Sequence, residues 1–292
     1  MKVKVGASSA NLGPGFDCFG LAWQLYDTME FLPSEKLIIE GCNEKYQNDR
    51  NLAYTAYIAA LKAAGRPENG VHIRFLDSEI PVSRGLGSSA ALIVGGVLAA
   101  DRLNGLGMTK DQLFAVASSV EGHPDNVAPA LFGGLTASAT EGDRAVTASY
   151  ALSEKLHFTA LVPPFELSTA LSRSVLPQSV VRGDAIFNVS RAALLLKALE
   201  NGDVELIRIA LQDKIHQPYR KGLIEGYDKA QALATELGAA GVCISGAGST
   251  VLCIAGSEDF YIKMGAAMAG EFPSWRVLEL QPDINGAKIT EG

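Results

Sequence analysis

Apolar and polar residues recur at two different spacings along the chain, and the two spacings follow each other in no regular order. Polar and apolar residues alternate from Lys2 to Ala7, which is typical of a strand. Short apolar runs predict further strands over residues 37–40, 71–76, 131–138, 157–162, 241–245, 251–255 and 275–280. Apolar residues at helical spacing predict helices over residues 51–64, 88–103, 109–120, 184–200, 204–210, 226–237 and 258–269.

This irregular mixture predicts an α+β fold rather than a doubly wound parallel sheet, in which strands and helices alternate regularly. A polar, turn-like stretch over residues 141–155 separates two sets of predicted elements. We therefore expect an N-terminal part over residues 1–150 and a C-terminal part over residues 151–292.

Composition narrows the class of protein. The 292 residues are 48% hydrophobic and 20% charged, as in a folded chain, and the net charge of −7 argues against coating nucleic acid or an anionic membrane. The apolar stretch 90–100 is shorter than the ~20 residues that span a bilayer, and residues 1–6 lack a signal-peptide core. We expect a cytoplasmic protein that binds neither nucleic acid nor a membrane. The four cysteines show no CxxC spacing and are expected to be buried, reduced thiols.

Three glycine-rich stretches, at residues 7–17, 81–91 and 245–250, carry the candidate chemistry. In the second, Gly85 and Gly87 allow the backbone to turn and to approach an anion closely. Ser88 and Ser89 stand where a predicted helix begins, and the free amides and positive dipole end of a helix favour phosphate. A serine hydroxyl there can also reach Mg²⁺. The structural alternative is a capped helix start after a tight turn.

Two familiar phosphate-binding motifs do not fit the second stretch. The chain contains no G-x-x-x-x-G-K-[ST], so this is not an ordinary P-loop. The spacing of Gly85, Gly87 and Ala90 imitates the dinucleotide fingerprint. However, Pro81 interrupts the strand that should lead into it, and Asp101 comes too early to be the acidic residue that binds ribose.

The segment from Pro81 to Ala91 resembles the phosphate loop of the GHMP kinases, a family of small-molecule kinases. All three motifs of this family occur in order between residues 7 and 250, so the resemblance covers nearly the whole chain. Ser-Ala-Asn-Leu-Gly-Pro-Gly-Phe-Asp at 9–17 and the segment 121–134 are similar to the members that act on homoserine. The resemblance implies ATP-dependent phosphorylation of the side-chain hydroxyl of L-homoserine to O-phospho-L-homoserine, in threonine biosynthesis.

The resemblance also implies an architecture. We expect two lobes, the N-terminal one similar to the second domain of ribosomal protein S5 and the C-terminal one ferredoxin-like. ATP and L-homoserine, as the small-molecule partners, are expected to meet in the cleft between the lobes. The family is often dimeric, so a homodimer is the expected assembly, although no apolar stripe in the sequence identifies its interface.

Site residues for ATP and Mg²⁺ follow from matching the family's second motif. The expected nucleotide-binding residues are Pro81, Ser83, Arg84, Gly85, Leu86, Gly87, Ser88, Ser89, Ala90 and Ala91. The chain has no P-loop lysine, so the helix start and Mg²⁺ must neutralise the phosphates. Mg²⁺ takes hard oxygen ligands, and Ser88 and Glu121 are the expected ones. The alternative for Glu121 is a solvated residue at a helix end.

Site residues for the amino acid match other family positions. Thr169, Arg173 and Arg220 are expected to hold the substrate, because the arginine fork binds a carboxylate through two hydrogen bonds. The expected contacts of the ammonium and hydroxyl end are Asn11, Asp17 and His123. Gly248, in the third motif, is expected to close the site or to brace the second motif; its alternative is a hairpin turn.

The sequence leaves open how the substrate hydroxyl loses its proton. Asp125 matches a residue that acts as general base in some relatives, and it is expected to be a base or a positioning residue, together with Ser88 and Glu121. Direct transfer to phosphate is the alternative, since phosphoryl transfer relies mainly on positioning and charge stabilisation. Two other functions compete: a GHMP kinase for a mevalonate-type alcohol, and a non-catalytic ligand-binding regulator. Asp17 favours homoserine, because mevalonate carries no ammonium group.

Overall fold

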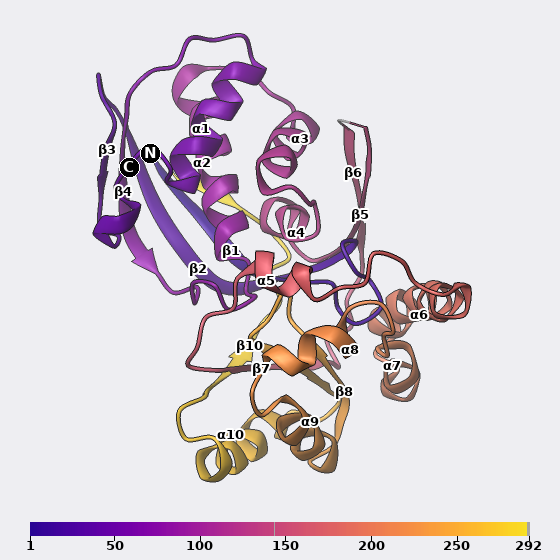
Figure 1. The fold of residues 1–292 in the computed structure, drawn as a ribbon. Helices are drawn as coiled ribbons and strands as arrows, with labels where there is room; N and C mark the ends of the chain where they lie inside the picture. Colours follow the sequence, from indigo (N-terminus) through magenta and orange to yellow (C-terminus); the bar gives the residue numbers. More distant parts are fainter. Residues whose placement is uncertain (143, 291–292) are drawn as a thin grey trace.

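Two β-sheets, each with helices packed on it, make up the structure, a computed structural model that describes residues 1–142 and 144–290 (Figure 1). The first sheet and its helices form one lobe, and the second sheet lies below it in this view. Both ends of the described chain lie beside each other at the first sheet.

Among the described residues, the first sheet has seven strands, and its main path runs in the order β11-β1-β2-β4-β3. β5 pairs with β2 and carries β6 as a hairpin. All pairings are antiparallel except that of β3 with β4. The strands are β1 (Lys2–Ala10), β2 (Phe19–Pro33), β3 (Ile38–Glu40), β4 (Val71–Ser78), β5 (Leu135–Glu141), β6 (Arg144–Tyr150) and β11 (Lys288–Thr290).

In the described part of the chain, the helices on the first sheet are α1 (Leu52–Ala63), α2 (Ser88–Asn104), α3 (Lys110–Glu121) and α4 (Val127–Phe132). α2 is the central helix, and most of its apolar residues between Ala90 and Ala100 are buried. Asn51 caps α1, because its side-chain oxygen accepts from the amide of Ala53 at 3.0 Å. The predicted capping box of Thr109 and Gln112 forms at the start of α3.

The second sheet is antiparallel throughout, in the order β10-β7-β9-β8. Its strands are β7 (His157–Val162), β8 (Ala239–Ile244), β9 (Val251–Ala255) and β10 (Arg276–Leu280). The covering helices are α9 (Tyr227–Glu236) and α10 (Phe260–Glu271). With chain order β7, helices, β8, β9, α10, β10, this sheet is the split β-α-β of a ferredoxin-like lobe.

A long excursion between β7 and β8 supplies the remaining helices: α5 (Thr169–Ser174), α6 (Arg182–Asn201), α7 (Val204–Ala210) and α8 (Gln217–Arg220). Two short 3₁₀ helices lie at Glu44–Tyr46 and Lys221–Leu223. α5 and α8 lie where the two lobes meet, and α6 and α7 lie to one side (Figure 1). This excursion therefore brings C-terminal residues to the first lobe.

The two lobes share a hydrophobic core. Trp23 of β2 packs against Phe158 of β7, with ring centroids 5.1 Å apart, and both side chains are buried. The indole N–H of Trp23 donates to the hydroxyl of Ser9 at 2.8 Å. A continuous core across the junction fixes the relative position of the lobes.

The α+β prediction is confirmed, and most predicted elements are present. Three predictions were wrong. β2 was not predicted, because its first five residues are buried on both faces and its alternation of buried and exposed residues begins only later. Residues 144–150 form a strand rather than a turn, although residue 143 lies outside the described part. The predicted strand 131–138 begins as the end of α4, and β5 starts at Leu135.

β11 pairs with β1, so residues 288–290 belong to the first sheet. The division at residue 150 stays a prediction, and the last residues of the predicted C-terminal part, 291–292, lie outside the described residues. All four cysteines are free thiols; Cys243 and Cys253 are buried as predicted, whereas Cys18 and Cys42 are only half-buried. Within the described chain, no helix combines the length and the apolar character needed to cross a membrane.

Candidate active site between the two lobes

A cleft of about 530 Å³ opens where the lobes meet, and all three glycine-rich stretches reach it. The predicted site residues that line the cleft are Asn11, Asp17, Pro81, Ser83, Arg84, Gly85, Leu86, Gly87, Ser88, Ser89, Glu121, His123, Asp125, Thr169, Arg173, Arg220 and Gly248. Ala90 and Ala91 do not line it, because their side chains are fully buried in the core. The fold therefore brings together side chains that are up to about 240 residues apart in the sequence.

The phosphate loop binds the rest of the protein through its carbonyl groups. Four consecutive carbonyls accept hydrogen bonds: Ser83 from the amide of Leu167 (2.9 Å), Arg84 from the amide of Thr250 (3.0 Å), Gly85 from the hydroxyl of Ser245 (2.6 Å) and Leu86 from the amide of Ser8 (3.0 Å). In the described part of the chain, the amides of residues 87–90 have no protein acceptor. α2 begins here without a side-chain cap, so its first amides are free for an anion.

Gly85 and Gly87 are required by both conformation and space. Their φ angles are +77° and +73°, in the region that side chains rarely adopt. A Cβ at Gly85 would lie 2.2 Å from the carbonyl oxygen of Ser245, and a Cβ at Gly87 would lie 2.1 Å from the hydroxyl of Ser8. These glycines therefore let the loop pack tightly against both lobes.

Arg84 braces the loop. Its guanidinium donates to the carbonyl groups of Pro163 (3.1 Å), Pro164 (2.9 Å) and Val82 (2.9 Å). Through these bonds, Arg84 connects the loop to the segment after β7.

The amide of Ala91 is not free, unlike the amides of residues 87–90, because it already donates to the carbonyl of Gly87 at 2.9 Å.

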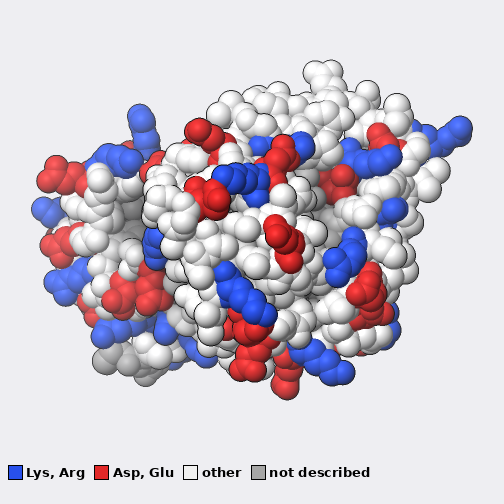
Figure 2. Space-filling model, turned by 90° about the horizontal axis from the view of Figure 1, so that it is seen from below, with Lys and Arg blue, Asp and Glu red and all other residues white. Residues whose placement is uncertain are grey.

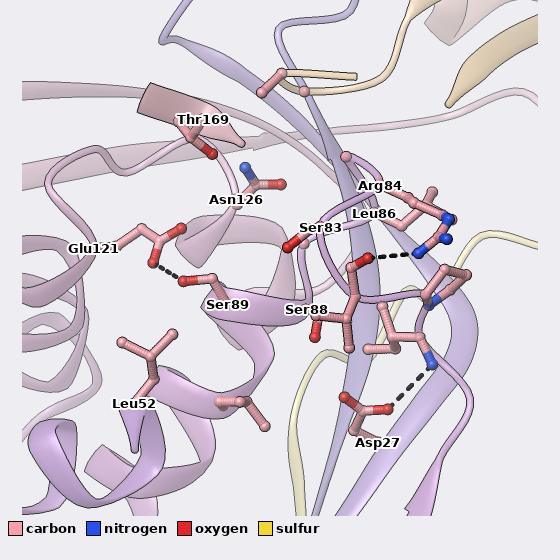
Figure 3. Close-up of a pocket in the computed structure, with 18 of the residues that line it drawn as sticks. Asp27, Leu52, Ser83, Arg84, Leu86, Ser88, Ser89, Glu121, Asn126 and Thr169 are labelled. Carbon is pink, nitrogen blue, oxygen red and sulfur yellow. Dashed lines mark hydrogen bonds between the residues drawn. The ribbon is translucent and has the colours of Figure 1, made fainter. Parts of the chain in front are cut away.

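A carboxylate and two hydroxyls lie beside the start of α2. The hydroxyl of Ser89 donates to Glu121 at 2.6 Å, and Ser88 points in another direction (Figure 3). Burial raises the pKa of Glu121, an effect that the Ser89 hydrogen bond and the nearby His123 oppose. Glu121 is thus a carboxylate with few partners in a dry setting, which favours binding of a cation.

His123 and Asp125 form a second polar group in the cleft. The Nδ1 of His123 donates to Asp125 at 2.8 Å, and the amide of Asn126 donates to the same oxygen at 3.0 Å. Burial lowers the pKa of His123, but the hydrogen bond and charge of Asp125 and the charge of Glu121 outweigh it, and the net shift is upward. The other oxygen of Asp125 can accept a proton or a hydrogen bond from a hydroxyl in the cleft.

Asp17 and Arg173, predicted to bind opposite ends of the substrate, bind each other in this structure. The guanidinium donates two hydrogen bonds to the carboxylate, at 2.6 and 3.0 Å. The hydrogen bond to Asp17 raises the pKa of Arg173. Asp17 has a φ of +54°, and its amide donates to Asn11 at 2.9 Å, which fixes the loop that presents it.

Arg220 lies deeper in the cleft and is 1% exposed. It donates to the carbonyl groups of Ser172 (3.2 Å) and Gly246 (3.1 Å), and its guanidinium lies over the ring of Phe16. Burial lowers the pKa of Arg220, and the nearby Arg173 adds to this effect. Two guanidinium groups therefore share one region of the cleft, which is suited to an anionic group of a ligand.

Several site residues were not predicted. Phe16 stands inside the first motif, but its stacking beneath Arg173 and Arg220 has no sequence signal. His216 precedes Arg220 by one helical turn, and that spacing was a signal that could have identified it.

Taken together, the cleft joins an anion-binding helix start to a pair of opposite charges. Polyphosphate fits the free amides of α2, and a zwitterion fits the pair Asp17 and Arg173. Asp125 lies in the same cleft as both. This arrangement is suited to phosphoryl transfer from a nucleotide to a small amino acid.

Comparisons with known proteins agree with this geometry. The model of the GHMP kinase N-terminal domain matches residues 51–134, and that of the GHMP kinase C-terminal domain matches residues 195–261. A homoserine kinase of Clostridium botulinum is 42% identical over 292 residues, 99% of this chain and 98% of the relative.

Solved structures extend the comparison to the fold. The crystal structure of a homoserine kinase from Cytophaga hutchinsonii superposes with a TM-score of 0.88 at 29% identity, covering 99% of this chain and 96% of the other. A mevalonate kinase from L. major, in complex with R-mevalonate, has a TM-score of 0.72 at 17% identity, with 95% of each chain covered. The second similarity is one of fold alone.

Proposed function

The chain belongs to the homoserine kinase family of GHMP kinases, and we propose that its cleft transfers phosphate from ATP to the side-chain hydroxyl of L-homoserine. The product is O-phospho-L-homoserine, an intermediate of threonine biosynthesis. One observation supports this reading above all. The uncapped start of α2 and the oppositely charged pair of Asp17 and Arg173 line the same cleft.

We assign the phosphates of ATP to the start of α2. The amides of residues 87–90 are free and point along the positive end of the helix dipole. Because four loop carbonyls are held by other segments, the loop does not need to rearrange to present these amides. Arg84 and Gly85 then act mainly by holding the loop in place.

When homoserine binds, its ammonium and carboxylate can take the place of the partners that Asp17 and Arg173 now have in each other. Asp17 and Arg173 satisfy each other in this structure. An α-amino acid carries both charges, so its ammonium can bind Asp17 while its carboxylate binds Arg173 and Arg220. A monoanionic alcohol would take Arg173 and leave Asp17 unpaired, which costs free energy. The exchange therefore selects zwitterions.

Ser88 and Glu121 are the residues that would hold Mg²⁺. Among the described residues, no group of three or more His, Cys, Asp and Glu side chains could hold a metal ion unaided. The hydroxyl of Ser88 and the carboxylate of Glu121 are hard oxygen donors, the kind that Mg²⁺ would take together with phosphate oxygens and water. When bound, the ion supplies positive charge that stabilises the phosphates during transfer.

Asp125 and His123 are assigned to the hydroxyl that receives the phosphate. Asp125 is 2% exposed and oriented by two donors, His123 and the amide of Asn126. Two roles are consistent with this position: accepting the hydroxyl proton, or orienting the hydroxyl while the proton goes to phosphate. General-base help is worth about 10²–10⁴-fold in rate, so kcat of an Asp125→Asn variant distinguishes them.

The Mg²⁺ assignment is tested by Glu121→Gln. This change keeps the shape and the ability to accept from Ser89 but removes the charge. We expect turnover to fall and the Mg²⁺ concentration for half-maximal rate to rise at least about tenfold. Glu258→Gln, on the exposed surface, is the matched control and should behave as the wild type. Normal metal dependence of Glu121→Gln would remove Glu121 from the metal site.

A further inference from the structure

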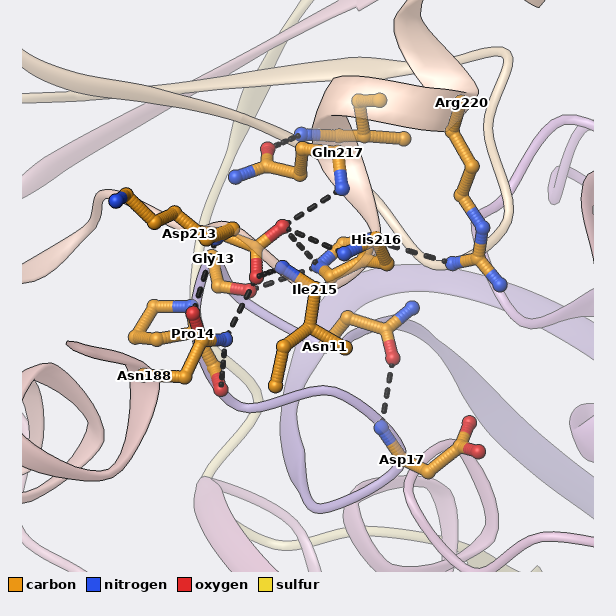
Figure 4. A network of polar contacts seen from close by, with 12 residues as sticks. Asn11, Gly13, Pro14, Asp17, Asn188, Asp213, Ile215, His216, Gln217 and Arg220 are labelled. Atoms are coloured by element: carbon orange, nitrogen blue, oxygen red, sulfur yellow. Dashed lines mark hydrogen bonds and ion pairs between the residues drawn. The ribbon is translucent and has the colours of Figure 1, made fainter. Parts of the chain in front are cut away.

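Asp213 is a buried carboxylate outside the cleft contacts described so far, and it binds four N–H groups (Figure 4). Its side chain is 0% exposed. The donors are the side-chain amide of Asn188 (2.6 Å) and the backbone amides of Ile215 (2.8 Å), His216 (3.0 Å) and Gln217 (2.6 Å). Only a carboxylate, which has acceptors and no donor, satisfies all four at once.

These bonds set the start of α8, the helix that carries Arg220. Asp213 accepts from the amide of Gln217, the first residue of α8, and from the amides of the two residues before it, so the carboxylate caps the helix from outside its own sequence. Gln217 adds a second anchor, since its side-chain oxygen accepts from the amide of Ile244 in β8 at 2.8 Å. Arg220 follows within one turn, so its position depends on this start.

His216 carries the connection to the guanidinium itself. Its Nε2 lies 2.8 Å from the carbonyl oxygen of Gly13, so Nε2 bears the proton and donates. Nδ1 is then an acceptor, and Arg220 Nη1 donates to it at 3.4 Å. Burial lowers the pKa of His216, and the charge of Asp213, whose carboxylate lies 3.5 Å from Nε2, opposes this shift without reversing it. The net direction favours the neutral ring, in which Nδ1 is an acceptor. The ring also stacks on Phe16, at 5.2 Å between centroids.

The same cluster holds the loop that presents Asp17. The carbonyl of Gly13 accepts from His216, and the carbonyl of Pro14 accepts from Asn188 at 3.3 Å. Asn188 reaches Pro14 and Asp213 with one amide group. Both sides of the substrate site, the loop at 13–17 and Arg220, are therefore tied to one carboxylate.

We propose that Asp213 and His216 are positioning residues for the homoserine site. They hold Arg220 and the loop at 13–17 in the arrangement that receives the two charges of the amino acid, and neither of them lines the cleft beside the phosphate loop. The proposal rests on the proposed function and adds to it the residues that set the affinity for one substrate only.

The first test is Asp213→Asn. This change keeps the shape but places an NH₂ group against two N–H donors, which displaces the start of α8. We expect KM for L-homoserine to rise about tenfold or more, KM for ATP to stay within about twofold, and the protein to remain folded by circular dichroism. Asp203→Asn is the matched control, because Asp203 caps α7 through Leu206 but does not line the cleft.

His216 provides a second test that does not depend on how Asp213→Asn folds. Glutamine can still donate to Gly13 and accept from Arg220, whereas phenylalanine keeps only the ring that stacks on Phe16. We expect KM for L-homoserine to rise about tenfold in His216→Phe and to stay within about threefold of the wild type in His216→Gln. KM for ATP should be unchanged in both.

Each other outcome contradicts the proposal. An unchanged KM for L-homoserine in folded Asp213→Asn or His216→Phe would refute it, as would an equal rise for L-homoserine and ATP. Equal defects in His216→Phe and His216→Gln would mean that the hydrogen bonds of the ring have no part. Failure of the wild type and Asp203→Asn to phosphorylate L-homoserine would instead refute the proposed function, and this proposal with it.

Discussion

Individual charges decide what enters the cleft. Asp17 and Arg173 are 156 residues apart in the sequence, and each could be assigned to the substrate from its motif. Their mutual ion pair could not be predicted, because it depends on how α5 packs against the N-terminal loop. The hydrogen bond from Ser89 to Glu121 could not be predicted either, because it depends on how α3 packs against α2.

Arg173→Lys tests the exchange of charges at the residue scale. Lysine cannot make the two parallel hydrogen bonds of a guanidinium to a carboxylate. We expect KM for L-homoserine to rise about tenfold or more, with KM for ATP unchanged, in steady-state kinetics. Arg182→Lys, at the exposed start of α6, is the control and should not differ from the wild type. An unchanged KM in Arg173→Lys would mean that this arginine does not bind the substrate.

At the scale of elements, the sequence was most informative where a local signal is strong. The glycine turn and the start of α2 were predicted to the residue, because a helix start leaves a local mark in sequence. β2 was not predicted because its first five residues are buried on both faces of the sheet. Burial of that kind comes from tertiary packing and leaves no two-residue alternation.

Asp27 belongs to the strand that was not predicted, and it supports the segment just before the phosphate loop. It lies on β2, and its carboxylate accepts from the amide of Ile80 at 3.1 Å, just before the phosphate loop (Figure 3). Burial raises the pKa of Asp27 to about 6, above its ordinary value of 3.8, despite two backbone hydrogen bonds that lower it. The folded protein therefore binds this proton more tightly than the unfolded chain does. Its stabilising effect is fully present below pH 3.8 and is lost as the pH rises through about 6.

The free energy of unfolding should reflect this proton. Between pH 5 and pH 8 we expect the wild type to lose about 1.4 kcal/mol relative to Asp27→Asn, which cannot ionise at this position. Urea unfolding of both proteins at the two pH values measures the difference. If the difference in free energy of unfolding between the two proteins is the same at pH 5 and pH 8, Asp27 does not have a raised pKa in the folded protein.

At the scale of the whole molecule, the two lobes work as one body. A shared core at Trp23 and Phe158 joins them, and Arg84 and Arg173 make polar contacts across the cleft. On the face seen from below, acidic and basic side chains are interspersed, with no broad basic area for a polyanion (Figure 2). The expectations of a homodimer and of a cytoplasmic location stay predictions.

The two-lobed α+β fold could be predicted from the sequence because the family motifs span almost the entire chain. Many residues that line the cleft could be predicted from the motifs, but the hydrogen bonds and ion pairs between them could not. Arg220 was assigned from its motif, whereas Asp213 and His216, which hold it, belong to no recognised motif. Their role comes from buried hydrogen bonds that only the folded chain creates.

In the proposed function, one cleft binds Mg-ATP and a zwitterionic alcohol and transfers phosphate between them. The most direct measurement is ADP release in a coupled assay, with L-homoserine, D-homoserine, L-serine, mevalonate and no acceptor compared side by side. We predict rapid turnover with L-homoserine, abolished by EDTA, and none above background with mevalonate. L-serine, one methylene shorter, should be slower by about 10–200-fold. Turnover with mevalonate, or none with L-homoserine, would contradict the proposed function.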